Sequence, residues 1–181
     1  MSDRRPIAID AMGGDHAPDE IVRGAVDYAR AEGRRVLLVG RPEQIEPALS
    51  HYHKHGAPLE VVPATEVIGI EDKLAAIRNK RDSSIHVGAR LVRDGEAAGF
   101  ASLGHTGAFM AVAKMIVGLI EGVDRPVLPA PLPRRESGRT VVVDAGANVD
   151  CTAEHLRQFA VMGREYARVV LGVEKPRVAL L

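Results

Sequence analysis

The sequence predicts an α/β fold with three layers, α/β/α, in which helices cover both faces of a mainly parallel sheet. Short apolar runs alternate with amphipathic runs of helical spacing along the 181 residues, which is the pattern of strands joined by crossover helices. Three of the apolar runs end in glycine-rich turns, at residues 10–18, 104–108 and 144–150. The length suits a single α/β domain over 1–181 with a sizeable core.

The first elements are the clearest. Residues 6–9 form an apolar run that leads into the first glycine turn. Apolar residues at helical spacing follow over 21–29, and Gly33 is placed to cap that helix at its C-terminus. Residues 36–40 are apolar throughout, which is typical of a strand buried on both faces.

The middle of the chain continues the alternation. A helix is expected over 42–55, with strands over 59–62 and 99–102. Asp82-Ser83-Ser84 offers an N-cap to a further helix. Residues 109–120 are apolar on most sides, so they predict a buried helix.

The last third carries proline-rich and charged segments. The prolines of 125–133 exclude a central strand and predict an edge strand or an extended connection. Residues 140–144 form the clearest candidate for a buried strand, and 156–170 follow as a helix with one apolar face. Cys151 is interpreted as a small buried residue. Residues 176–181 have a strand pattern with no crossover after it, which suggests that the sequence is cut short.

The composition excludes several classes of protein. Lys plus Arg and Asp plus Glu both number 24, which argues against a general nucleic-acid binder. One cysteine excludes an internal disulfide and a cysteine-only metal site. No signal peptide is visible and no apolar run reaches spanning length, so we expect a soluble cytoplasmic protein. We expect no cofactor and no metal ion.

The glycine turns are candidate anion sites. Glycine lets the backbone come close to a ligand, and the free N–H groups and dipole at a helix start favour an anion. In open α/β sheets the binding crevice lies outside the strand ends. Alternatively, the turns need glycine for their geometry alone, and Thr106 is only a helix cap. The candidate phosphate- and substrate-binding residues are Asp10, Gly13, Gly14, Asp15, Gly104, Thr106, Gly107, Asp144, Gly146 and Asp150.

Positive charge is concentrated in one segment. Lys73, Arg78, Lys80 and Arg81 lie within nine positions of an otherwise neutral chain. Such a run is usually a solvated helix face. The functional alternative is an edge that receives an anionic substrate or an acidic partner protein.

The ordered set of motifs resembles that of the bacterial phosphate acyltransferase family over essentially the whole chain. The matching segments are residues 9–18, 80–84, 104–108, 144–151 and 158–163. The resemblance implies an isopropylmalate-dehydrogenase-like fold. The family usually has Asn where this chain has His105, an exchange that keeps a hydrogen-bonding side chain and adds a titratable group. Family members also run on for a second portion of comparable size.

The resemblance implies that acyl-[acyl-carrier protein] and inorganic phosphate react to give acyl-phosphate for phospholipid synthesis. Asn148 or His105 would then stabilise the oxyanion, while His16 adjusts the protonation of phosphate or donates to the leaving thiolate. The acidic carrier protein would dock on the basic segment 73–81. A homodimer is implied for the full-length enzyme, with peripheral membrane attachment in some members.

Two other functions stay open on the sequence alone. One is a related enzyme, either a phosphate acetyltransferase or a decarboxylating dehydrogenase of the isopropylmalate type. The absence of a Gly-x-Gly-x-x-Gly pattern with a following acid weakens a nucleotide site. The other is a non-catalytic fragment that binds an anion or the carrier protein. An enzymatic function requires the three glycine turns to converge on one pocket.

Overall fold

The computed structural model describes residues 5–52, 57–72, 74–135 and 137–181. The chain divides into two compact units, residues 1–118 and 119–181, and each unit is described by itself. The expectation of one domain over 1–181 stays a prediction.

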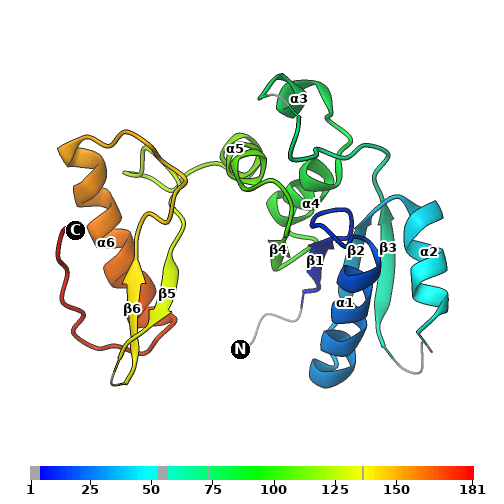
Figure 1. Ribbon diagram of the computed structural model, residues 1–181, viewed down its shortest axis with the longest axis horizontal. Coiled ribbons are helices and arrows are strands. Elements are labelled where there is room, and N and C mark those ends of the chain that lie inside the picture. Colours follow the sequence, from blue (N-terminus) through cyan, green and yellow to red (C-terminus); the bar gives the residue numbers. More distant parts are fainter. Residues whose placement is uncertain (1–4, 53–56, 73, 136) are drawn as a thin grey trace. The chain divides into compact units, whose positions relative to one another are not determined.

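The first unit is built on a four-stranded parallel sheet (Figure 1). The strand order is β3-β2-β1-β4, and every neighbouring pair is parallel. The strands are β1 (Ile7–Asp10), β2 (Val36–Gly40), β3 (Leu59–Pro63) and β4 (Gly99–Ala101). This order places the C-terminal ends of β1 and β4 side by side, and the first two glycine turns follow those two ends.

Helices cover both faces of this sheet, which confirms the three-layer α/β/α prediction. The helices are α1 (Asp19–Glu32), α2 (Pro42–Ser50), α3 (Leu74–Asn79), α4 (Ser84–Arg93) and α5 (Thr106–Ile116). Because side chains alternate along a strand, Val36 and Leu38 pack with α1 and α2. Leu37 and Val39 pack on the opposite side with α4.

Two local predictions in the first unit can be compared with the structure. Gly33 caps α1 with a φ of 60°, as expected. The helix predicted over 42–55 ends at Ser50, with His51 as its C-cap, and residues 53–56 lie outside the described residues.

The prediction of a buried helix over 109–120 is wrong in extent and in burial. The helix α5 ends at Ile116, and its buried residues are Ala108 and Val112. Met115 is 56% exposed. Helix α5 carries apolar side chains on most of its sides. Among the described residues of the first unit, only the side that faces α3 and α4 has a packing partner.

The second unit has a different architecture. Strand β5 (Ala130–Pro133) pairs antiparallel with β6 (Arg139–Val142), and helix α6 (Ala153–Val169) packs on β6. The proline-rich segment is therefore an edge strand, as predicted. The buried strand predicted over 140–144 is wrong, because in the described part of the chain β6 pairs with that edge strand alone and is half-buried at most.

Two further predictions in this unit are wrong. Cys151 is exposed rather than buried, in the loop before α6. Residues 176–181 form no strand, and Leu180 is 76% exposed. A strand needs a neighbour with which to exchange backbone hydrogen bonds, and the residues that the structure describes give this segment none. Among the described residues, no helix combines the length and apolarity needed to cross a bilayer.

Candidate anion site

Asp10 is the centre of the first glycine turn. It ends β1, and only 1% of it is exposed. Its Oδ1 accepts a hydrogen bond from the Met12 N–H at 3.0 Å. The following Gly14 has a φ of 114°, which a residue with a side chain rarely adopts. The carboxylate of Asp10 thus stabilises the turn through the Met12 N–H.

Ser102 joins the second turn to the first. Its Oγ donates to Oδ2 of Asp10 at 2.7 Å and accepts from the Gly104 N–H at 3.1 Å. A Cβ placed on Gly13 would lie 2.6 Å from Oδ2 of Asp10 and 2.8 Å from the Gly104 nitrogen. Glycine is therefore required at position 13 by close approach. We call residues 10–14 and 102–107 the paired turns.

The paired turns present backbone donors. In the part of the chain that the structure describes, no acceptor bonds the N–H groups of Gly13 and Gly14. The N–H groups of Thr106 and Gly107, the first two of α5, are likewise without an acceptor there. N–H donors on two touching turns, one of them a helix start, favour an oxyanion.

His105 caps α5. Its Nδ1 accepts the Ala108 N–H at 3.2 Å, so the proton of the neutral ring is assigned to Nε2. Asparagine is a preferred N-cap residue, and the ring nitrogen of His105 accepts the same kind of backbone bond in this chain. Thr106 is the first helical residue and not the cap. The alternative that Thr106 serves only as a helix cap is therefore wrong. The neutral ring of His105 then has one donor, its Nε2–H.

The other predicted residues of the first turn are more peripheral. Asp15 and His16 are both exposed. His16 lines a polar hollow at the start of α1 together with Ala17, Asp19 and Glu20. The two carboxylates of that hollow disfavour an anion within it.

The third glycine turn lies in the second unit and is organised around its own acid. Oδ1 of Asp144 accepts from the Leu128 N–H at 2.8 Å, and Oδ2 accepts from the Asn148 N–H at 2.6 Å. The Asn148 Nδ2 donates to the Pro126 carbonyl at 3.0 Å and to Asp144 Oδ2 at 3.1 Å. Both amide hydrogens of Asn148 are therefore in use. The convergence of this turn with the other two stays a prediction.

The rest of the third turn is open. Gly146 has a φ of 99°, and a Cβ there would meet nothing within 4 Å. Asp150 is exposed, and its carbonyl accepts from Nη1 of Arg125 at 2.9 Å. Glycine at position 146 thus serves backbone conformation, whereas at position 13 it serves close approach.

The basic segment is only partly available for a partner. The Lys80 Nζ donates to the Val67 carbonyl at 2.8 Å and to Oδ2 of Asp72 at 2.6 Å. The hydrogen bond from Lys80, with a second from the Gly69 N–H, lowers the pKa of Asp72. Arg78 and Arg81 are exposed. Lys73 lies outside the described residues.

The following residues 82–86 are structural. Oδ2 of Asp82 accepts from the hydroxyl of Thr65 at 2.6 Å and from its N–H at 3.0 Å, and these two bonds lower the pKa of Asp82. Ser83 is the N-cap residue of α4, as expected of 82–84, but its hydroxyl bonds Nδ1 of His86 at 2.8 Å instead of the helix backbone. Burial is the main cause that lowers the pKa of His86.

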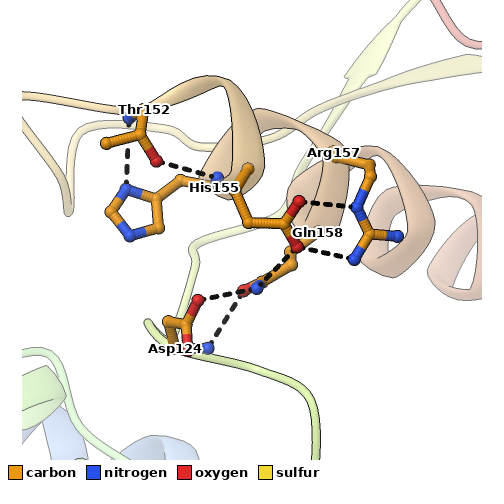
Figure 2. A network of polar contacts seen from close by, with 6 residues as sticks. Asp124, Thr152, His155, Arg157 and Gln158 are labelled. Carbon is orange, nitrogen blue, oxygen red and sulfur yellow. Dashed lines mark hydrogen bonds and ion pairs between the residues drawn. The ribbon is translucent and has the colours of Figure 1, made fainter.

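Sequence reasoning missed Ser102 and the part played by Gln158. Figure 2 shows the buried Gln158 bridging to Asp124, whose N–H it accepts at 3.0 Å and whose Oδ2 it binds through Nε2 at 2.7 Å. Glu154, bound by Arg157 and then by Gln158, has its pKa lowered to about 2. Gln158 thus holds Asp124, two residues before Pro126. The third turn binds the same segment through the Pro126 carbonyl. Its inclusion in the matching segment 158–163 was the only signal.

Comparisons with known proteins agree with the motifs. The family model described as fatty acid synthesis protein matches residues 6–181. A phosphate acyltransferase of Nitratidesulfovibrio vulgaris is 48% identical over 97% of this chain and 51% of its own length. Those of Syntrophomonas wolfei and Desulforamulus reducens are 48% and 50% identical over 97% of this chain, and over 55% and 52% of their own lengths. The chain spans about half the length of these curated relatives.

Proposed function

The chain belongs to the fatty acid synthesis protein family, and on that premise we propose that it carries the phosphate-binding part of a site that forms acyl-phosphate. The substrates are acyl-[acyl-carrier protein] and inorganic phosphate, and the product serves phospholipid synthesis. Three relatives of 48–50% identity are named phosphate acyltransferase, which supports the reaction class.

The observation that carries the proposal is the contact between the paired turns. The Ser102–Asp10 hydrogen bond and the close approach of Gly13 to Gly104 bring N–H donors from two turns together. Phosphate needs several donors at once, and backbone N–H groups supply them without adding a charge. One such turn would be ordinary, whereas two turns joined by a buried carboxylate form a built site.

The chemistry asks for positioning and charge stabilisation. An oxygen of hydrogen phosphate attacks the thioester carbonyl carbon, the carbon–sulfur bond breaks, and the proton of the phosphate passes to the departing sulfur. The paired turns hold the phosphate against the carbonyl. The His105 Nε2–H stabilises the developing oxyanion, and His16 is proposed to move the proton. Asn148 would have to release one of its two hydrogen bonds to serve as a second donor.

The test separates binding from turnover. Titration of this chain with inorganic phosphate, followed by calorimetry, should show binding that Ser102→Ala weakens at least several-fold. Gly24→Ala, on the open face of α1, should bind as the wild type does. Incubation with acyl-[acyl-carrier protein] and labelled phosphate should give labelled acyl-phosphate. Phosphate binding without product would favour the non-catalytic alternative, and no binding at all would refute the proposed site.

We further propose that the exposed Arg78 and Arg81 dock the acidic carrier protein. Lys80 supports the segment through Asp72 and Val67, so its charge is already partly neutralised. Exposed charge pairs are screened by salt, and steering charges act mainly on the association rate. Arg78→Glu with Arg81→Glu should slow carrier binding at low salt, as measured by stopped flow, while Arg23→Glu on α1 should not. Binding that is indifferent to salt would refute this docking edge.

We also propose a location, an oligomeric state and a membrane attachment for the full-length enzyme. A cytoplasmic location, a homodimer of the full-length enzyme and peripheral membrane attachment follow from the resemblance. Cell fractionation, sedimentation velocity and vesicle flotation of the full-length protein test them in turn.

A further inference from the structure

We propose that the apolar cavity between α4 and α5 holds the hydrocarbon tail of the acyl group. The inference rests on the proposed function, because it locates the tail of a substrate whose carbonyl reacts at the paired turns. The cavity lies entirely within the first unit.

The cavity has a volume of about 140 Å³. Helix α4 contributes Ile85, Ala89 and Val92 to its wall, and α5 contributes Phe109, Ala113 and Val117. Both sets recur at spacings of three or four, so each helix presents one apolar stripe to the other. None of the lining side chains is titratable, so the cavity suits an uncharged hydrocarbon and not a polar head group.

Phe100 completes the wall and is held in place by a glycine. A Cβ on Gly88 would lie 2.2 Å from Cε2 of Phe100, so only glycine lets this ring lie against α4. The ring centroid of Phe100 is 5.4 Å from that of Phe109, with an interplanar angle of 29°. The two rings therefore form one stacked aromatic wall.

This aromatic wall adjoins the second of the paired turns along the chain. Phe100 lies on β4 two residues before Ser102, and Phe109 lies in the first turn of α5, where its N–H donates to the His105 carbonyl at 2.9 Å. The loop that presents the second glycine turn is thus flanked at both ends by a ring of the cavity wall. An acyl chain with its carbonyl at this loop meets Phe100 and Phe109 first and runs along α5 toward Val117.

The size of the cavity sets how much of the tail it takes. Protein interiors are closely packed and contain few voids larger than a water molecule. An engineered apolar cavity of about 150 Å³ accepts a benzene molecule, so this cavity has room for about six carbon atoms. A longer tail would extend beyond it.

Binding of n-alkyl phosphates with two to ten carbons, measured by calorimetry on this chain, tests the inference. The affinity should rise about fourfold with each added methylene and level off after about six carbons. Ala113→Phe fills the cavity and should abolish the rise while leaving the affinity for inorganic phosphate unchanged. Met115→Phe, which adds the same ring to an exposed position of α5, should behave as the wild type.

A second probe makes this test independent of the phosphate site. Short n-alkanols should perturb the ring resonances of Phe100 and Phe109, while Phe159, the third phenylalanine of the chain, lies in the second unit and serves as an internal control. If phosphate does not bind but alkanols shift the resonances of these two rings, the proposed phosphate site is refuted, whereas binding of a hydrocarbon in the cavity is supported. An affinity independent of chain length, or an Ala113→Phe variant that keeps the rise, overturns the inference. Should Ala113→Phe not fold, Ala113→Val adds two carbon atoms to the wall and should lower the plateau by about two carbons.

Discussion

The paired turns of the first unit and the third turn of the second unit use similar residues in different environments. In the first unit, Asp10 is 1% exposed and its carboxylate joins two segments 92 residues apart. In the second unit, Asp144 is half-buried and binds neighbours within 16 residues. An aspartate followed by glycine can therefore serve long-range assembly or local loop geometry, and the difference lies in burial. Three substitution pairs test this contrast.

The largest difference is expected between the two glycines. Gly13→Ala would push a Cβ against Asp10 and the Gly104 backbone, and we expect a loss of about 3 kcal/mol in the free energy of unfolding. Gly146→Ala meets open space and carries only the strain of a positive φ, about 1 kcal/mol. Hydrogen exchange measures each unit separately. Equal losses would mean that close approach does not govern the first turn.

The two aspartates should differ by less. Asp10→Ala removes a carboxylate that is 1% exposed and accepts from the Ser102 hydroxyl and the Met12 N–H, and a loss of about 2 kcal/mol is expected. Asp144→Ala removes a carboxylate that is itself only half-buried, and about 1 kcal/mol is expected. Urea denaturation followed by hydrogen exchange gives both values. A greater loss at Asp144 would reverse the assignment of roles.

Two histidines extend the contrast to pH. His86 is buried beside Ser83, whereas His155 forms an exposed capping box with Thr152. Burial lowers the pKa of His86 below its usual 6.5, with Arg90 and Arg81 acting in the same direction and Ile77 and Glu66 opposing them.

As the pH falls, His86 therefore binds a proton at a higher pH in the unfolded chain than in the folded chain. Stability should be constant above the unfolded pKa and fall as the pH drops through about 6.5, by up to about 1.4 kcal/mol per pH unit. Urea denaturation between pH 5.5 and 8 measures this slope. His86→Gln should flatten the slope and the control His155→Gln should not. A wild-type curve that is flat from pH 8 to 5.5 would contradict this account.

The sequence alone predicted the elements whose apolar positions are buried as their pattern indicates. Residues 36–40 are apolar on every position and became the central strand β2, and the apolar positions of 21–29 became the buried face of α1. Residues 141–143 are also apolar, yet β6 pairs with a proline-bearing edge strand and stays half-exposed. Side-chain pattern reports strand preference but not the neighbour that a strand obtains.

The residues of the candidate site likewise fall into those that the sequence predicts and those that depend on tertiary neighbours. Glycine, aspartate and histidine in the turns were identifiable, because a turn after a strand limits the residues that fit. Ser102 was not, because a serine after a strand is common and its role depends on β4 lying beside β1. The engagement of both Asn148 amide hydrogens was likewise invisible, since hydrogen-bond partners come from tertiary structure.

The Ser102–Asp10 bond has a consequence for biosynthesis. Its partners are separated by 92 residues, and contacts of long sequence separation form slowly. While the chain leaves the ribosome, β1 can pair with β2 early, but one edge of β1 stays open until β4 has been made. We expect that nascent chains ending near residue 80 aggregate or recruit a chaperone, while those ending beyond α5 do not. Ribosome-bound chains of graded length, compared by protease resistance, would reveal this step.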